Sequence, residues 1–305
     1  MSEVTAINNL AHETPFQAFA RNYAKSRIAM AAFVVLAIIL FAALFAPWLS
    51  PQNPYDLAQL DIMDSKLAPG GKSSNSGSGT SMTYWLGTDD QGRDMLSGIL
   101  HGLRISLGVG IGATLAALAI GILAGLIAAY AGGWVEALIM RVVDLQLSFP
   151  AILIALILLA LTGQGVDKIV IALITVQWAY YARTVRGAAL VEKRKEYVDA
   201  AVCLGFSPTR IVLRHILPNV LPPLIVVATV QVAHAIALEA TLSFLGLGMP
   251  ITSPSLGLLI SNGFTHLLSG KYWISFFPGV ALLVTIMAIN LVGDQLRDVL
   301  NPRLK

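Results

Sequence analysis

The sequence predicts an all-α membrane protein. Hydrophobic residues make up 56% of the chain and charged residues only 12%, whereas a soluble domain carries about 25% charged residues. Several apolar runs approach the ~20 residues that a helix needs to cross a bilayer. Helices satisfy their own backbone hydrogen bonds in lipid, and the alternating pattern of barrel strands is absent. The composition therefore excludes an ordinary soluble domain of this length.

Six apolar runs predict six spans, at residues 28–49, 103–131, 137–161, 169–189, 220–245 and 273–292. The first run is too long for a signal-peptide core and no cleavage pattern follows it, so we expect a retained anchor. The third carries Arg141 and Asp144, and each would cost about 2.5–3.5 kcal/mol at the bilayer centre. Near the membrane surface, and three residues apart on one helix face, they can pair and extend toward water at lower cost.

The distribution of Lys and Arg predicts that both termini are cytoplasmic. With the N-terminus inside, fourteen of the 20 basic residues fall on its side of the membrane and six on the other, the bias typical of cytoplasmic loops. Topology thus explains the formal charge of +3, and no nucleic-acid partner is implied. The expected organisation is a cytoplasmic segment 1–27, a span 28–49, an extracytoplasmic segment 50–102, a five-helix core 103–293 with a cytoplasmic loop 190–218, and a cytoplasmic tail 294–305.

The N-terminal segment has the pattern of a helix on the membrane surface. Thr14 and Pro15 suit an N-cap and a first helical position. Aromatic and small residues then recur at helical spacing beside basic ones, which favours an interfacial helix. The alternative is a disordered tail that only carries topogenic charge.

The extracytoplasmic segment combines a flexible stretch with an acidic turn. Its centre, GGKSSNSGSGTS, has the composition of a Gly/Ser linker. A phosphate-binding loop would need Gly where Lys66 stands, so we expect no ATPase motif and no nucleotide cofactor. The following turn gathers Asp89, Asp90, Arg93 and Asp94. Three carboxylates make a metal site conceivable, but the ligand spacing of a calcium loop is absent and a salt-bridged turn is favoured.

The second span carries a stripe of small residues. They recur every four positions, at Ala113, Ala117, Gly121, Gly125 and Ala129. One face of this helix is therefore nearly bare backbone and can accept another helix at close range. We interpret the stripe as a packing surface.

The loop KEYVDAAVCLGFSPTRIVLRHILPN is the most polar long segment in the second half of the chain. Gly205 suits the left-handed position that ends a helix, and Ser207 with Pro208 suits the start of the next. We expect a second helix up to Leu217, after which Pro218 marks re-entry into the membrane. The small side chains of Ala200 and Ala201 at the expected exposed bend make the loop suitable for another protein to bind, although a basic connecting loop would share these features.

The stretch DAAVCLGFSPTRIVLRHILP resembles the EAA loop of ABC-importer permeases, whose pattern is E-A-A, three residues, G, nine residues, I, one residue and L-P. The resemblance implies that the ATPase-coupling residues are Asp199, Ala200, Ala201, Gly205, Leu217 and Pro218. Asp199 stands in place of Glu but retains the charge and the acceptor oxygens, and His215 stands in place of Ile.

The resemblance extends over nearly the whole chain. LGTDDQGRDMLSGILHGLRISL, RVVDLQLSFP, LSFLGLG and NLVGDQLRDVLNPRLK are similar to the C-type permease subunit of dipeptide and oligopeptide importers. This implies a type I ABC importer permease fold in the bacterial inner membrane, with no bond chemistry of its own. The implied partners are a homologous second permease, two cytoplasmic ATPase subunits and an extracytoplasmic binding protein. Importers of this group handle dipeptides, longer peptides, glutathione or nickel.

Two ionisable residues in the fifth span, His234 and Glu239, are candidates for the pathway. Glu239 lies toward the outer end, where it could meet the ammonium group of a peptide or pair with a basic residue of the partner permease. Asp294, Arg297 and Asp298 alternate in sign, and we expect local salt bridges that cap the last helix instead of a site.

Three other functions fit the sequence less well. A gradient-driven transporter would need coupling-ion ligands at membrane depth, and the spans offer few carboxylates. A membrane scaffold would give no reason for the spacing within the polar loop. An intramembrane enzyme would need a nucleophile with its base or a metal cluster, and none stands out in the spans.

Overall fold

The computed structural model describes residues 15–56, 60–74, 82–250, 253 and 255–300, and over these it is an all-α protein with one small β-ribbon. The N-terminal third contains α2 (Pro15–Ala24), α3 (Arg27–Leu44), α4 (Ala46–Leu49), a 3₁₀ turn η2 (Ile62–Asp64) and the antiparallel strands β1 (Gly71–Lys72) and β2 (Thr83–Tyr84). The remainder contains α5 (Met95–Ala131), α6 (Gly133–Leu147), α7 (Ala151–Thr162), α8 (Val166–Lys193), α9 (Glu196–Cys203), α10 (Pro208–Ile211), the π-helical turn η4 (Val212–Ile216), α11 (Leu217–Phe244), α12 (Leu256–Phe264), the 3₁₀ turn η5 (Leu267–Ser269) and α13 (Trp273–Leu300).

The long helices agree with most of the predicted spans. Within the described residues, four helical stretches are long and apolar enough to cross a membrane: α3, α5, the unbroken run Pro208–Phe244, and α13. The pair α6 and α7 would make a fifth if it forms one span. Helix α8 has 28 residues, but Asp167 and Lys168 near one end and Arg183 and Arg186 toward the other shorten its uncharged stretch.

The predicted span over residues 137–161 is not one continuous helix. The chain bends there by 88° between α6 and α7, because Pro150 lacks a backbone N–H and keeps the preceding residue out of the helical conformation. Asp144 does not pair with Arg141, which its sequence position allows. Asp144 instead forms an ion pair with Arg183 of α8, so this charge joins two helices.

The small-residue stripe of α5 packs directly against α8, as its sequence predicts. All five of its residues are buried. A Cβ atom added at Gly125 would lie 2.6 Å from Cβ of Val185 and 2.7 Å from the carbonyl oxygen of Ala182. Lys193 closes the end of this pair by donating from Nζ to the carbonyl oxygens of Ala129 and Tyr130 at 3.1 and 3.0 Å. Helices α5 and α8 are therefore closely packed along this stripe.

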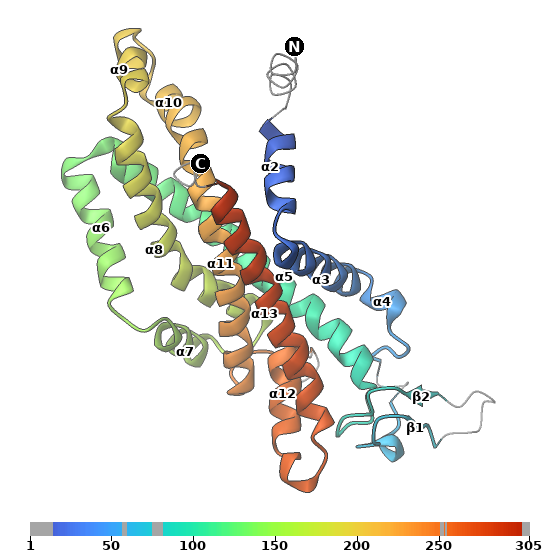
Figure 1. Cartoon of the computed structure of the whole chain (residues 1–305). Coiled ribbons are helices and arrows are strands. Elements are labelled where there is room, and N and C mark those ends of the chain that lie inside the picture. Colours follow the sequence, from blue (N-terminus) through green and yellow to red (C-terminus); the bar gives the residue numbers. More distant parts are fainter. Residues whose placement is uncertain (1–14, 57–59, 75–81, 251–252, 254, 301–305) are drawn as a thin grey trace, which may run out of the picture.

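The two ends of the bundle differ (Figure 1). The segment from α9 to α10, the helix α2 and the C-terminal end of α13 lie toward one end, and the β-ribbon and α12 lie toward the other. Helix α2 begins at Pro15, as expected, and contacts α13; its predicted cap Thr14 lies outside the described residues. Helix α11 packs against α5, α8, α12 and α13, so it runs through the centre of the bundle.

The segment before α5 is organised around buried Asp64. Its carboxylate accepts hydrogen bonds from the hydroxyls of Ser73 at 2.7 Å, Ser74 at 2.6 Å and Tyr84 at 2.9 Å. The predicted salt-bridged turn is confirmed by an ion pair of 2.7 Å between Arg93 and Asp89, both buried. Part of the Gly/Ser stretch, residues 75–81, lies outside the described residues, but the strands on either side of it pair with one another.

We predict that Gly125→Ala destabilises the protein, whereas the same change at Gly112 does not. The added methyl group has no room against Val185, and overpacking of this kind costs about 1–3 kcal/mol. At Gly112 on the same helix nothing lies within 4 Å of the added atom, and Ala is the better helix former. Thermal unfolding of both variants in detergent tests this, and equal unfolding temperatures would contradict the packing described for α5 and α8.

We also predict that the segment before α5 is sensitive to acid. Burial raises the pKa of Asp64, but the hydrogen bonds from Ser74, Ser73 and Tyr84 outweigh it and hold the pKa below its ordinary value of 3.8. The ionised carboxylate is thus favoured by folding, so its contribution is present at neutral pH and is lost as the pH falls below about 3.8 through the lower folded pKa.

Hydrogen exchange of residues 61–74 and 82–93 measures this effect. Asp64→Asn should weaken protection at pH 7, because the amide replaces an acceptor by a donor, and should reduce the change in protection on acidification. An unchanged acid response in Asp64→Asn would assign the effect to another group.

Candidate functional site

The polar loop, residues 195–218, is a rigid helix–turn–helix. Helix α9 ends in a Schellman motif, in which Phe206 N–H donates to the carbonyl of Ala201 at 3.2 Å and Gly205 N–H to that of Val202 at 2.9 Å. Gly205 has a φ of +73°, the left-handed conformation predicted for it. Ser207 is the N-cap residue and Pro208 begins α10, also as predicted.

The second helix does not end at Leu217, but it does not continue simply through Pro218 either, as predicted, because a π-turn precedes the proline. Helix α10 passes through the π-turn into α11, giving one helical stretch from Pro208 to Phe244. The N–H of Leu217 reaches five residues back to the carbonyl of Val212, which inserts an extra residue before the proline. Asn219 Nδ2 donates at 2.7 Å to the carbonyl of His215. The helix therefore accommodates Pro218 without stopping.

One face of the loop is packed against the bundle and the other is exposed. Val198, Ala201, Ile211 and Ile216 are buried in one cluster with residues of α5 and α8. Ala201 is thus a packing residue, and the expectation that it lies at the exposed bend is wrong. Asp199 and Ala200 do face outward. Large apolar side chains are exposed beside them: 57% of Val202, 71% of Leu204 and 55% of Leu213.

A set of polar contacts attaches the loop to the end of α8. Tyr197 Oη donates to Glu192 Oε2 at 2.6 Å, Lys195 Nζ donates to Glu192 Oε1 at 2.6 Å, and Asn219 Nδ2 donates to Tyr197 Oη at 3.2 Å. Burial raises the pKa of Glu192, but the hydrogen bonds from Lys195 and Tyr197 outweigh it and lower the pKa overall. Burial and the Glu192 carboxylate raise the pKa of Tyr197 to about 12. We call Glu192, Lys195, Tyr197 and Asn219 the loop latch; sequence spacing did not reveal it.

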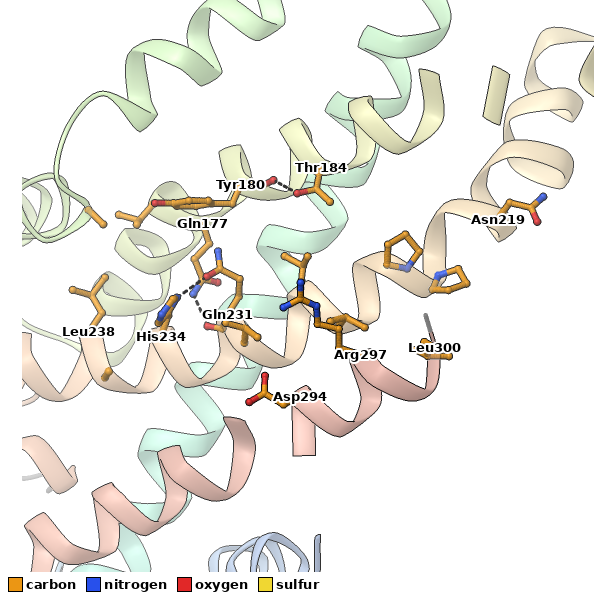
Figure 2. A pocket seen from close by; sticks show the side chains of 18 of the residues that line it. Gln177, Tyr180, Thr184, Asn219, Gln231, His234, Leu238, Asp294, Arg297 and Leu300 are labelled. Atoms are coloured by element: carbon orange, nitrogen blue, oxygen red, sulfur yellow. Dashed lines mark hydrogen bonds between the residues drawn. The ribbon is translucent and has the colours of Figure 1, made fainter. Parts of the chain in front are cut away.

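A large open cavity begins at the loop latch. It has a volume of about 1440 Å³ and lies between α7, α8, α11 and α13. It extends from Glu192, Lys195 and Asn219 to Ala151 and Thr241. Along α11 its wall follows helical spacing, with Val227, Val230, Gln231, His234, Ala237, Leu238 and Thr241 (Figure 2).

The middle of this wall holds a polar network. Thr114 Oγ1 of α5 donates to Gln177 Oε1 at 3.1 Å, and Gln177 Nε2 of α8 donates to the carbonyl of Gln231 at 3.1 Å. His234 Nδ1 lies 3.0 Å from Gln231 Oε1. These contacts join three helices, and Figure 2 shows Gln177, Gln231 and His234 together beside the cavity. Of the two predicted pathway residues, His234 therefore lines the cavity.

Glu239, the other predicted pathway residue, does not. It is 0% exposed and accepts hydrogen bonds from Ser106 Oγ at 2.8 Å and Ser243 Oγ at 2.7 Å. These partners satisfy the carboxylate where α5 meets α11, so it makes no contact with the cavity in this structure. The sequence marks the residue as ionisable but does not show which way it faces.

The last helix contributes charges that sequence analysis did not count as a site. Asp294 and Arg297 line the cavity (Figure 2). The ion pairs found among the described residues do not include either of them or Asp298, so the expected local salt bridges are absent there. Within the described part of the chain, no three His, Cys, Asp or Glu side chains group as metal ligands do.

The chain matches two family models. Residues 121–305 match "Binding-protein-dependent transport system inner membrane component", and residues 14–69 match "N-terminal TM domain of oligopeptide transport permease C". The dipeptide transport system permease protein DppC of Escherichia coli (strain K12) is 40% identical over 308 residues, covering 100% of both chains. The glutathione transport system permease protein GsiD of Escherichia coli O6:K15:H31 is 35% identical over 292 residues, covering 96% of this chain and 92% of the relative.

A solved structure has the same fold. A chain of the MetNI methionine ABC transporter, in an inward-facing conformation, superposes with a TM-score of 0.56 at 20% identity, covering 67% of this chain and 97% of that chain. The full-length relatives, the family models and this shared fold agree with one another. The chain belongs to the family of binding-protein-dependent transport system inner membrane components.

Proposed function

We propose that this chain is one of two permease subunits of an ATP-driven importer and forms half of the pathway for dipeptides and oligopeptides. One observation carries the proposal: the helical stretch from Pro208 to Phe244 begins in the exposed loop and continues, without a break, into the cavity wall. A force on the loop is therefore transmitted along the helix to Gln231 and His234.

The proposed topology has six spans, with both termini in the cytoplasm of a bacterial cell and the chain in the inner membrane. Helix α8 supplies one span, although charged residues toward its ends shorten its apolar stretch, and α6 with α7 forms a bent one. The distribution of basic residues supports this orientation. It also agrees with the position of α2, the loop and the end of α13 toward one end of the bundle (Figure 1).

The proposed partners follow from the surfaces. The exposed face of the loop, with Asp199, Ala200 and Leu204, binds one of two cytoplasmic ATPase subunits, and Gly205, Leu217 and Pro218 fix its shape. A homologous second permease closes the open side of the cavity. A substrate-binding protein approaches the opposite, extracytoplasmic end. This chain carries out no bond chemistry, and ATP is hydrolysed by its partners.

The proposed cycle is a population shift between two arrangements. ATP binding closes the ATPase pair and moves the loop of each permease that the ATPases hold. The two permease subunits then rotate relative to one another, so that the cavity opens to the other side of the membrane. The loop latch matters here because a loose loop would absorb the movement. The tight pair α5–α8 moves as one body for the same reason.

The names of the relatives support peptides as the substrates of this chain. The relative from strain K12 is a dipeptide permease. Glutathione or nickel import by the same machinery is the alternative. The GsiD relative is named as a glutathione transport system permease protein, and glutathione is itself a small peptide. An ion-gradient-driven transporter or a scaffold would leave the helix that joins loop and cavity unexplained.

The single cysteine provides a direct test of the ATPase contact. Cys203 is the only cysteine in the chain and is exposed at the end of α9. We expect a membrane-impermeant maleimide to label it in inverted membrane vesicles but not in intact spheroplasts, and we expect the assembled ATPase subunits to protect it. Cys203→Ser supplies the unlabelled control. Labelling from the outside would overturn the orientation, and equal labelling with and without the ATPases would overturn the docking site.

A second test concerns coupling through Gly205. We expect Gly205→Val to abolish ATP-dependent uptake of labelled dipeptides into vesicles that contain the whole transporter. A β-branched residue is strained at a φ of +73°, although nothing lies within 4 Å of the added Cβ. Gly205→Asn is the matched control, because Asn tolerates this conformation, and it should retain most of the uptake. Normal uptake by Gly205→Val at normal protein level would contradict the assignment, as would uptake driven by an ion gradient without the ATPases.

A further inference from the structure

We propose that Gln231 and His234 bind the peptide unit of the substrate as it crosses the cavity. The inference rests on the proposed function and goes further, because it assigns a binding site to two side chains in the middle of the pathway. They lie three residues apart on α11, so both face the cavity (Figure 2).

Some hydrogen-bonding groups of this network have partners inside the protein, and others remain available to a ligand. Gln177 uses its amide nitrogen on the backbone carbonyl of Gln231 and its amide oxygen on Thr114, so it joins α5, α8 and α11. The Gln231 side chain is 7% exposed, and its Oε1 faces His234. Its Nε2 has no partner among the described residues. Nε2 is not one of the fully buried polar atoms that lack a partner, so it is accessible to a group that enters the cavity.

The open groups complement an amide. Gln231 Oε1 can only accept, so its contact of 3.0 Å with His234 Nδ1 requires a proton on Nδ1. The tautomer that is protonated there alone presents Nε2 as an acceptor. The pair then offers N–H donors on Gln231 and one acceptor on His234. A peptide unit offers a C=O acceptor and an N–H donor, which matches both.

The charges of the cavity lie on other elements. Glu192 and Lys195 are at the end near the loop, and Asp294 and Arg297 face the cavity from α13. The site on α11 has no acidic side chain and no Lys or Arg. A site that recognises the shared backbone amide, and not a side-chain charge, suits peptides of varied sequence.

Uptake of an amide and its ester analogue tests the site. The substrates are a labelled dipeptide and its depsipeptide, in which an ester oxygen replaces the backbone N–H and removes the donor meant for His234. The complete transporter is compared with His234→Phe, and the ratio of amide to ester uptake is measured below saturation. Any preference of the binding protein is common to both transporters and cancels in the comparison.

We expect the amide preference to fall about threefold to tenfold in His234→Phe, the value of one hydrogen bond. His234→Gln, which restores a carbonyl acceptor, should recover part of it. Gln231→Leu should reduce uptake of both substrates, since both retain the C=O. Thr184→Val is the matched control: this residue also lines the cavity, but its hydroxyl already donates to the carbonyl of Tyr180 at 2.9 Å, so no change is expected.

An unchanged ratio in His234→Phe overturns the inference. Protection of Cys203 by the ATPases is measured in the same samples, so failure of assembly is recognised separately. If His234→Phe does not assemble with the ATPases, the ratio of amide to ester uptake is measured with His234→Ala and tests the inference in the same way. Loss of Cys203 protection or of ATP dependence in the unmodified transporter would instead count against the proposed function.

Discussion

The close approach of α5 and α8 is the constraint on which the other features depend. Gly125 allows the backbone of α5 to approach Val185 and Ala182 more closely than any larger residue would. The ends of these two helices supply the surface that buries Val198 and Ala201 of the loop, and their middles hold Thr114 and Gln177. A wider separation would therefore disturb the loop and the cavity wall together.

The continuity from α10 to α11 connects the loop to the cavity wall through a single helix. A helix broken at Pro218 would let the loop pivot independently of the cavity. The π-turn avoids the break by shifting the hydrogen-bond register by one residue. The loop latch fixes the same element from the side through Tyr197 and Asn219. Both devices resist bending where the loop meets the bundle, as coupling between separate sites requires.

Local patterns predicted most elements, and contacts between distant residues explain what was missed. The small-residue stripe, the turn at Gly205 and the helix start at Ser207 and Pro208 each depend on a few neighbouring residues, and all were predictable. The passage of the helix through Pro218 by a π-turn was not predictable, because it depends on a hydrogen bond from residue i to residue i−5 that no propensity specifies. Asp144 was paired with its neighbour in sequence, but its partner is Arg183 on another helix.

The sequence also does not show which polar side chains within the spans face the cavity. Ionisable residues in a membrane are treated as functional by default, yet Glu239 is fully buried and hydrogen-bonded to two serines. Gln231 carries no charge and attracted no notice in the sequence, but it faces the cavity with an unpartnered amide nitrogen. At this position on α11 a neutral group suits varied peptides, because a charge in its place would hold some substrates and repel others. A neutral amide can release each of them at little cost.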